Sequence, residues 1–451
     1  MRYARAPMGR DARPIVIVGA GLAGCEAAWQ AARRGVSVRL YEMRPHHGSP
    51  AHATGDLAEL VCSNSLRSNQ LSHAVGLLKE EMRRLGSLVL EAADSCAVPA
   101  GRALAVDRVA FARRITEAIE AHPRIEVRRE RVAKLPDDER VILATGPLTS
   151  PDLAAELQAL LGEASLYFYD AIAPVVYADS VDPAVPFRAS RWEAGPGDYL
   201  NLPLSRGGYE TFVDALVEAD TVPLHPCERA LYFEGCLPIE EMARRGRETL
   251  AHGPLKPVGL VDPRGGRRPH AVVQLRHEDR AGALYNLVGF QTKLRVGDQQ
   301  RVFRALPGLG RAVFARYGSV HRNTYVNAPR QLGPTLELRR RPGLHVAGQM
   351  AGVEGYVESA ALGGLAGIFA AFAARGAEPP LPPETTAHGA LLRHLRDADP
   401  RHFQPMNVNW GLFPASAPPS RREGRAARND RLAARALADL EPWSARTVLA
   451  A

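Results

Sequence analysis

The feature that most constrains the fold is a glycine-rich turn near the N-terminus. The β-branched run Ile15–Val18 has the composition of a strand buried on both faces. Residues 26–34 have helical composition, Gly35 ends this helix, and residues 36–42 form a second predicted strand that ends in Glu42. Between the first strand and the helix stands the motif GxGxxG, made of Gly19, Ala20, Gly21, Leu22, Ala23 and Gly24.

This order of strand, glycine turn, helix and acidic strand end is the dinucleotide-binding fingerprint in its structural context. The glycines permit a tight turn and a close approach of the backbone to a pyrophosphate. The N-terminus of the helix offers free N–H groups to the anion. Glu42 stands 18 residues beyond Gly24, where a carboxylate holds the hydroxyls of the adenosine ribose. We therefore expect residues 19–24 and Glu42 to bind a dinucleotide.

Two later segments favour FAD over NAD as this dinucleotide. Residues 140–147 form a predicted strand ending in Ala-Thr-Gly, a pattern of FAD-dependent enzymes where the chain returns to the nucleotide domain. Residues 344–349 form another short strand, followed by a glycine-rich loop and a small-residue helix over 359–374. Many flavoproteins place such a unit against the pyrophosphate and flavin, so Gly348 and Gln349 are further cofactor-binding candidates. The chain has no second GxGxxG, so we expect NADH or NADPH to be a visiting co-substrate.

The predicted fold class is α/β. We expect a Rossmann-like FAD-binding domain built from two separate segments, residues 14–170 and 335–412. Residues 171–334, rich in short strands and turns, are expected to form an inserted α+β domain. Residues 1–13 and 420–451 are terminal extensions. The Arg/Ala-rich tail predicts a solvated helix or a frayed end, with RNA contact as the alternative.

Composition narrows the class of protein further. The 451 residues carry a net charge of +8, a mild indication of a polyanionic partner. The five cysteines form no CxxC and no zinc-type spacing with histidine, so we expect no metal and a reducing compartment. Only four lysines occur in a strongly Arg-rich background.

The N-terminal segment has two interpretations. Basic residues precede an apolar run that ends at Cys25, as in a lipoprotein signal. We favour the strand and glycine turn, because cleavage there would destroy the nucleotide-binding unit. The uncharged stretch 359–374 is shorter than the roughly 20 residues of a membrane span. A cytoplasmic protein without a membrane partner is expected.

Several longer motifs are more specific than a generic flavoprotein. They are YEMRP at 41–45, LVCSNSLRSN at 60–69, AVGLLKEEM at 74–82, FEGCLPIE at 233–240, NLVGFQT at 286–292 and GVEGYVES at 352–359. Together they resemble the TrmFO family, a branch of the GidA-like flavoproteins, over roughly residues 14–412. The resemblance implies a methylenetetrahydrofolate–tRNA-(uracil-5-)-methyltransferase that forms 5-methyluridine at position 54 in the T-loop. It implies bound FAD in a domain of the GidA and glutathione-reductase type, with 5,10-methylenetetrahydrofolate and NADH or NADPH as co-substrates. It also implies that the inserted domain, residues 171–334, lies on the side of the tRNA and folate.

The resemblance also implies two catalytic cysteines, Cys62 and Cys236. Uracil C5 is a poor nucleophile until a thiolate adds at C6, so cysteine is the residue type that this chemistry needs. We assign attack at C6 to Cys236 and proton removal to Cys62, with the reverse assignment left open. Polar neighbours surround both cysteines, whereas the other three are expected to be inert: Cys25, Cys96 and Cys227. Weaker candidates for substrate contacts are Lys79, Lys256, Arg276, His277 and Asn323.

Two alternative enzymatic functions stay open at this point. One is a GidA-type enzyme acting on the wobble uridine of tRNA, although such chains usually carry an additional helical domain. The other is a flavin-dependent NAD(P)H oxidoreductase of small molecules, which would not need Cys62 and Cys236. A non-catalytic flavin-dependent RNA binder or redox sensor also stays open. Oligomeric state is not fixed by the sequence, and a monomer is compatible with it.

Overall fold

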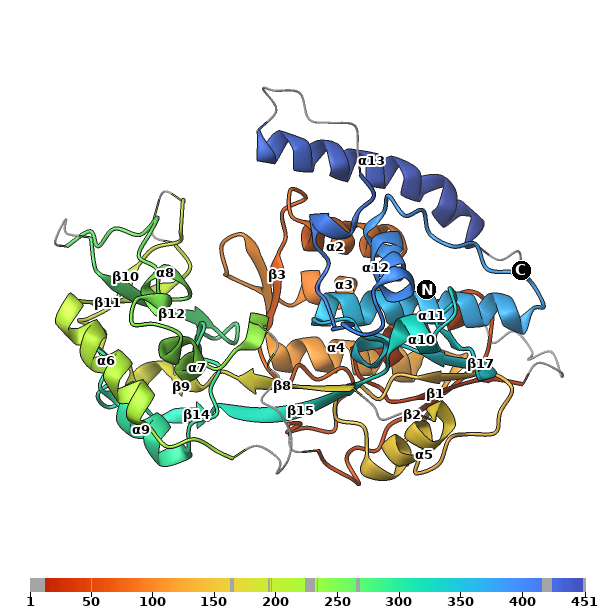
Figure 1. Cartoon of the computed structure of the whole chain (residues 1–451), viewed down its shortest axis with the longest axis horizontal. Helices are drawn as coiled ribbons and strands as arrows, with labels where there is room; N and C mark the ends of the chain where they lie inside the picture. The colour runs from red at the N-terminus through yellow and green to blue at the C-terminus, as the bar shows by residue number, and fades with distance from the viewer. Residues whose placement is uncertain are drawn as a thin grey trace.

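The structure is a computed structural model that describes residues 13–49, 51–162, 166–193, 195, 197–223, 232, 234–264, 268–415 and 424–448. Cys227, expected to be inert, lies outside these residues. Two bodies are visible in Figure 1, a helix-covered sheet at the right and a second sheet with its own helices at the left. This architecture confirms the predicted Rossmann-type α/β domain with an additional domain of strands and helices. The predicted domain boundaries stay predictions.

The first sheet has the order β16-β17-β7-β1-β2-β6, and all of its strands are parallel except the edge strand β16. The predicted strand Ile15–Val18 is β1, and its residues are at most 4% exposed. The strands predicted within residues 36–42, 140–147 and 344–349 are present with bounds shifted by a few residues, whereas two further strands of this sheet were not predicted. The bounds are β2 (Val38–Tyr41), β6 (Ile125–Arg128), β7 (Val141–Leu143), β16 (Glu337–Leu338) and β17 (Arg341–Val346).

Two helices, α1 (Leu22–Arg33) and α11 (Tyr356–Ala374), pack against each other with their backbones in close contact. A Cβ added at Gly363 or Gly367 of α11 would lie only 2.1 or 2.3 Å from a carbonyl oxygen of α1. Helix α1 begins inside the glycine motif, four residues before the predicted start, because Gly21 is already its N-cap. Glycine is therefore needed in α11 for packing.

Helix α11 is also the one described helix that is long and apolar enough to cross a membrane. However, 83% of its most apolar window is buried inside the protein. It packs against α1 and the parallel sheet, so it is the core helix of the first domain.

The remaining helices of the first domain cover this core, and a small sheet of order β3-β5-β4 lies beside them. Helix α13 runs along α2, far away in sequence (Figure 1), and buries Leu440 and Trp443 in the same core. The Arg/Ala-rich tail thus holds a helix with one buried face. The bounds are α2 (Ala74–Arg84), α3 (Leu88–Ser95), α4 (Arg108–Ala121), α5 (Pro151–Leu161), α10 (Ala328–Gln331), α12 (Ala387–Asp397), α13 (Arg425–Arg446), β3 (Ser65–Ser68), β4 (Ala97–Val98) and β5 (Ala103–Val106).

The second domain is built on an antiparallel sheet of order β10-β11-β12-β13-β9-β14. It has its own core, in which α6 and α9 pack against the sheet through Phe212, Phe290 and Phe303. The bounds are β9 (Val175–Tyr177), β10 (Phe187–Arg188), β11 (Leu200–Leu204), β12 (Ala271–His277), β13 (Leu284–Leu287), β14 (Phe314–Arg316), α6 (Arg206–Glu218), α7 (Ile239–Arg244), α8 (Thr249–His252) and α9 (Val296–Arg304).

A two-stranded ribbon connects the two bodies. Strands β8 (Leu166–Ile172) and β15 (Ser319–Tyr325) pair antiparallel over their whole length and run between the two sheets in Figure 1. One strand leads into the second domain and the other leads back. Because both strands cross at one place, polar side chains on this ribbon lie between the two bodies.

Candidate active site

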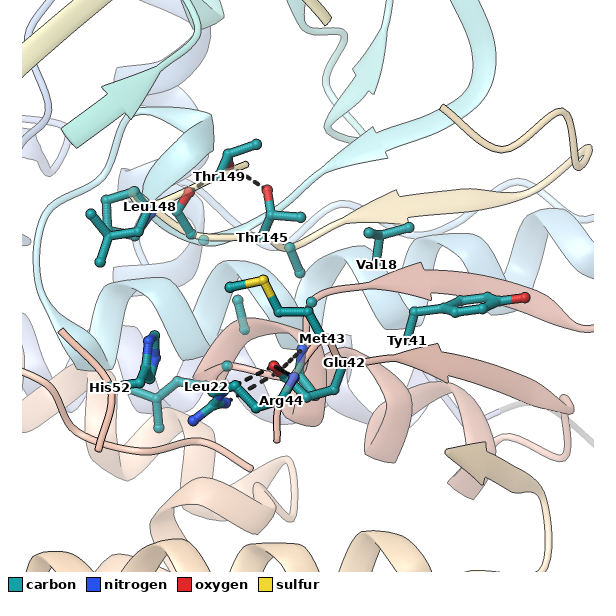
Figure 2. A pocket seen from close by; sticks show the side chains of 18 of the residues that line it. Val18, Leu22, Tyr41, Glu42, Met43, Arg44, His52, Thr145, Leu148 and Thr149 are labelled. Atoms are coloured by element: carbon teal, nitrogen blue, oxygen red, sulfur yellow. Dashed lines mark hydrogen bonds and ion pairs between the residues drawn. The ribbon is translucent and has the colours of Figure 1, made fainter. Parts of the chain in front are cut away.

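The carboxyl ends of β1, β2 and β7 open into a cavity of about 1110 Å³, part of it open to solvent. Figure 2 shows Glu42, Met43 and Arg44 on one side of it and Thr145, Leu148 and Thr149 on the other. The predicted cofactor-binding residues that line it are Gly19, Ala20, Gly21, Leu22, Ala23, Glu42, Gly348 and Gln349.

Gly24 is the one predicted cofactor-binding residue that does not line this cavity. A Cβ at Gly24 would lie 1.8 Å from the carbonyl oxygen of Gly19, so this glycine closes α1 onto the turn. Gly21 is the opposite case, because a Cβ there would meet no atom within 4 Å and would project into open space. Gly24 is therefore required for the packing of α1 against the turn, whereas Gly21 leaves space in the cavity for a ligand.

The residues present fit a dinucleotide. Gly21 caps α1 without a side-chain hydrogen bond, so the free N–H groups of the first turn remain available to a phosphate. Glu42 accepts hydrogen bonds from the Ala20 N–H at 3.2 Å and from the Arg44 Nε at 2.9 Å. Burial raises the pKa of Glu42, but the bonds and charge of Arg44 outweigh this and hold the pKa below its usual value. Glu42 is thus an ionised acceptor at the end of β2.

A second cavity, of about 1280 Å³, adjoins the first and is partly open to solvent. The two share a boundary formed by Val61, Pro147, Leu148, Gln349, Tyr356 and Ser359. The second cavity lies where the first domain, the β8–β15 ribbon and the second domain meet, and its lining includes both Cys62 and Cys236. Cys25 and Cys96 line neither cavity and are buried.

Cys62 is held by Tyr356, the first residue of α11. The Tyr356 hydroxyl donates to the Cys62 Sγ at 3.0 Å and accepts from the Cys62 N–H at 2.7 Å. Arg316 of β14 donates to the Cys62 carbonyl at 2.9 Å and so ties this loop to the second domain. Burial, followed by the charge of Asp170, raises the pKa of Cys62 to about 11, although the Tyr356 hydrogen bond opposes this.

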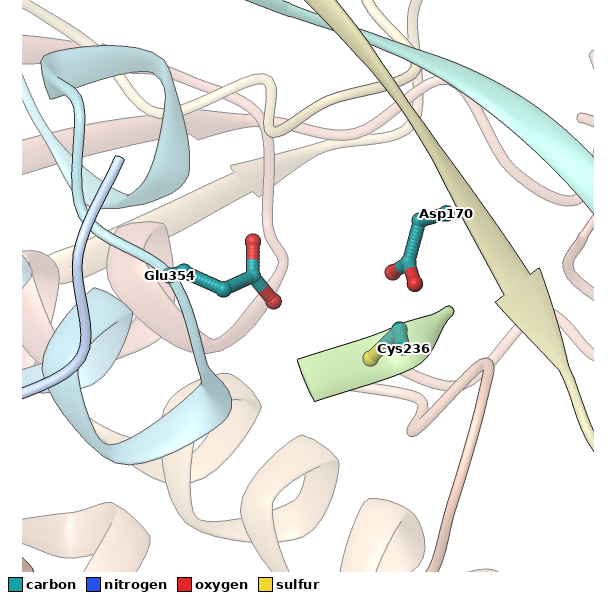
Figure 3. Close-up of side chains that lie close together, drawn as sticks. All are labelled: Asp170, Cys236 and Glu354. Carbon is teal, nitrogen blue, oxygen red and sulfur yellow. The ribbon is translucent and has the colours of Figure 1, made fainter. Parts of the chain in front are cut away.

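Cys236 stands at the end of the short turn Glu234–Cys236, close to two carboxyl groups. The Sγ of Cys236 and one oxygen each of Asp170 and Glu354 all lie within 4.8 Å of one another (Figure 3). Burial, followed by the charge of Asp170, raises the pKa of the Cys236 thiol well above its usual value. The protonated thiol is therefore the resting form near neutral pH.

Of the weaker candidates for substrate contacts, two line the second cavity and three do not. Arg276 lines the second cavity and donates to Ser63 Oγ and Asn64 Oδ1, both at 2.9 Å; Asn323 lines it as well. Lys79 is fully buried and donates to the backbone carbonyls of Leu66 and Ser68. Lys79 thus supports strand β3, which directly follows the loop that carries Cys62.

His277 and Lys256 do not line either cavity. The ring of His277 lies 4.9 Å from that of Tyr285, and Lys256 is exposed. Side chains alternate between the two faces of a strand, so Arg276 and His277 of β12 point to opposite faces. Only Arg276 therefore reaches the second cavity.

Three residues of the site had no role in the sequence-based predictions: Tyr356, Asp170 and Glu354. Tyr356 and Glu354 lie in the motif GVEGYVES, and Asp170 is the last residue of the segment assigned to the FAD-binding domain. A single carboxyl residue within the mostly apolar run at residues 166–172 is the signal that could have identified Asp170.

This fold and this pair of cavities define the class: a GidA-like protein with a Rossmann-type dinucleotide-binding domain. Residues 14–378 match the family described as Glucose inhibited division protein A. The structure resembles Aquifex aeolicus GidA in two crystal forms, with TM-scores of 0.70 and 0.67 at 18% and 17% identity. The match covers 98% and 97% of this chain, and 77% and 74% of those chains.

Sequence relatives define the particular family. The chain is 59% identical to "Methylenetetrahydrofolate--tRNA-(uracil-5-)-methyltransferase TrmFO" of Desulforudis audaxviator, covering 95% of this chain and 98% of that protein. The protein of the same name from Geobacter sulfurreducens is also 59% identical, covering 96% of this chain and 99% of that protein. The chain belongs to the TrmFO family within the GidA proteins, as its motifs predicted.

Proposed function

We propose that this folate-dependent tRNA (uracil-5-)-methyltransferase binds FAD in the first cavity and methylates C5 of uridine 54 in the T-loop. The carbon donor is 5,10-methylenetetrahydrofolate, and NADH or NADPH is the reductant. The observation that carries the proposal is the placement of two thiols, Cys62 and Cys236, in a cavity that adjoins the dinucleotide cradle. Neither a small-molecule oxidoreductase nor simple RNA binding needs that arrangement. A tRNA substrate also favours a cytoplasmic location.

The first cavity would hold FAD through the α1 N-terminus, Gly21, Glu42, Gly348 and Gln349. Bound FAD, once reduced, supplies the reducing equivalents that convert the transferred methylene group into a methyl group. The two cavities share lining residues, which supports delivery of those reducing equivalents into the second cavity. The larger second cavity would then take the folate and the target base.

Cys236 is the proposed nucleophile. Addition of its sulfur at C6 of uracil converts the ring into an enolate that is nucleophilic at C5. The target base must leave its stack to reach a cavity between the two domains. Arg276 and Asn323 offer hydrogen-bonding groups on the wall of that cavity, so we assign them to orienting the base or the folate.

Cys62 is the proposed acceptor of the C5 proton after C5 has bonded to the folate-derived carbon. The two hydrogen bonds from Tyr356 and Arg316 to the Cys62 residue fix its position. Because its pKa is raised to about 11, the Cys62 thiol is mostly protonated near neutral pH, and only the minor thiolate form can take the C5 proton. The Tyr356 hydroxyl donates to the sulfur and stabilises that thiolate, which is a strong base once formed. This division of labour between the two thiols needs both of them in one cavity.

Methyl transfer is the direct test of the proposed function. Protein with bound FAD, a tRNA transcript, NADH or NADPH and carbon-labelled 5,10-methylenetetrahydrofolate should give labelled 5-methyluridine at position 54. A transcript with cytidine at position 54 is the control and should remain unlabelled. Label at the wobble position, or none in tRNA while NAD(P)H is consumed, would contradict the proposal in favour of the two alternatives.

The affinity for tRNA should fall steeply with salt. A net charge of +8 in an arginine-rich chain favours contacts with phosphates, and each contact releases condensed counterions. With a few such contacts, the dissociation constant should rise at least about tenfold between roughly 50 and 200 mM salt. Fluorescence anisotropy of a labelled transcript measures this. An affinity that is unchanged over this range would argue against an arginine-lined RNA surface.

A further inference from the structure

The carboxyl group of Asp170 is placed to act on the thiol of Cys236. Asp170 comes from strand β8 of the ribbon and Cys236 from the turn Glu234–Cys236 of the second domain, and their side chains share a hydrogen bond. Figure 3 shows the Asp170 carboxyl group directed toward Cys236 and Glu354. One carboxyl oxygen, Oδ1 of Asp170, is buried and has no hydrogen-bond partner among the described residues. The hydrogen bond with Cys236 is therefore made by the other carboxyl oxygen, Oδ2, and this oxygen is the one placed to take the thiol proton.

The two nearby carboxyl groups are arranged to carry one negative charge between them. Burial, followed by the charges of Asp170 and Glu358, raises the pKa of Glu354 well above its usual value. Burial also raises the pKa of Asp170, but only to about 6, because hydrogen bonds from Cys236, Ala171 and Asn323 oppose it. Near neutral pH, Glu354 is therefore the protonated member and Asp170 the ionised one.

The carboxylate of Asp170 faces few other charges. Strand β15 places His321 opposite it in the ribbon, and the first domain contributes Cys62 and Glu354. Besides Asp170, the charged and titratable groups that line the same cavity are Cys62, Arg67, Cys236, Arg276, His321, Glu354 and Tyr356. Arg67 pairs with Glu358 and Arg276 is bonded to Ser63 and Asn64, so neither neutralises Asp170.

We propose that Asp170 is the general base that removes the proton from the Cys236 thiol when its sulfur attacks C6 of the target uracil. The inference rests on the proposed function, because it takes Cys236 as the nucleophile. It assigns a catalytic residue outside both cysteines. A thiol that is mostly protonated at neutral pH needs such a base, and Asp170 is the carboxylate in hydrogen-bonding contact with it.

The proposed step is balanced within the site. As the Sγ–C6 bond forms, the S–H proton moves to Asp170 and the π electrons of C5=C6 move onto C5 and the adjacent carbonyl oxygen. When the methylated ring is released, the C6–Sγ bond breaks and C5=C6 forms again. The departing sulfur then takes the proton back from Asp170. No external acid or oxidant is required for this exchange.

The test is the rate of covalent adduct formation between the FAD-loaded full-length protein and tRNA carrying 5-fluorouridine at position 54. Asp170→Asn keeps the shape of the side chain but cannot accept the proton. At pH 7.5 we expect its adduct rate to be about 100-fold lower than that of the wild type, the ordinary contribution of a general base. The rate of the variant should rise about tenfold per pH unit, because only the thiolate that forms unaided can react.

The wild-type rate should instead level off above pH 6, where Asp170 is ionised. Asp179→Asn is the matched control, because Asp179 is an exposed aspartate nearby in the sequence and lines neither cavity. Thermal unfolding and FAD content verify that Asp170→Asn is folded, and Asp170→Glu should recover part of the rate.

The outcomes separate the two proposals. An adduct on Cys236 that forms equally fast in Asp170→Asn, or that is slowed by one constant factor at every pH, refutes the base and leaves the proposed function standing. A wild-type adduct that maps to Cys62, or no adduct at all, refutes the role of Cys236 and the base with it.

Discussion

Cys236→Ala should form no covalent adduct with tRNA that carries 5-fluorouridine at position 54, while keeping its FAD. Fluorine at C5 cannot leave as a cation, so the substituted base traps whichever thiol has added at C6. Alanine removes the nucleophile but little volume from a half-buried turn, and the FAD cradle is formed by other residues. Trapping and methyl transfer should both fall below detection, because no other group replaces a missing covalent nucleophile.

Cys62→Ala should behave differently in one respect. It should also lose methyl transfer, but it should still form the adduct, since attack at C6 precedes proton removal from C5. Cys96→Ala is the matched control, because Cys96 is a buried cysteine that lines neither cavity. That variant should keep both trapping and turnover.

Peptide mapping of the trapped complex identifies the attacking thiol. An adduct on Cys62 would reverse the two roles and leave the methyltransferase function intact. Near wild-type methyl transfer by both Cys236→Ala and Cys62→Ala would rule out covalent catalysis by either thiol.

The parts of this protein that were predictable from its sequence are those with local causes. A β-branched run, a glycine turn and an acidic strand end lie within 28 residues, from Ile15 to Glu42, and they predicted β1, α1, β2 and the cavity beside them. The start of α1 was predicted too late, because the helix uses Gly21 inside the motif as its cap. Sequence patterns describe composition better than the position at which backbone hydrogen bonding begins.

No local sequence pattern predicted which residues meet in the second cavity. Tyr356 contacts Cys62 across 294 positions of sequence, and Asp170 meets Cys236 only because the β8–β15 ribbon passes between the two domains. These contacts depend on tertiary packing. Motifs supplied by the family resemblance marked both cysteines, but they did not distinguish Glu354 and Tyr356 from their neighbours.

The lysine at position 79 was a misleading signal of substrate binding, because its contacts also depend on tertiary packing. Lys79 is conspicuous in an arginine-rich chain, and we considered it for folate or phosphate contacts. The structure buries it completely, where it donates to the carbonyls of Leu66 and Ser68. A slender ammonium group fits between backbone carbonyls where a planar guanidinium would not. This support of the segment after Cys62 explains why position 79 carries a lysine and not an arginine.

Gly21→Val should yield folded protein without FAD. The backbone at Gly21 is extended, with φ −73° and ψ −169°, so a β-branched residue adopts it without strain. A Cβ there would meet no protein atom within 4 Å, and the side chain would project into the cavity where the pyrophosphate must approach. We expect an FAD affinity loss of at least about 100-fold, which corresponds to about 2.8 kcal/mol. Flavin absorbance per protein after purification, and titration with added FAD, measure it.

Gly297→Val is the matched control for this loss. Gly297 is an exposed glycine of α9, its added Cβ would also meet nothing within 4 Å, and it lines neither cavity. It should keep full FAD content, whereas Gly24→Ala should instead destabilise the fold, because its Cβ would lie 1.8 Å from the Gly19 carbonyl oxygen. Thermal unfolding separates these two effects: Gly21→Val should unfold at the temperature of the FAD-free wild type, and Gly24→Ala below it. Full FAD occupancy in Gly21→Val would mean that the pyrophosphate does not lie at this turn, and the first cavity would then need another ligand.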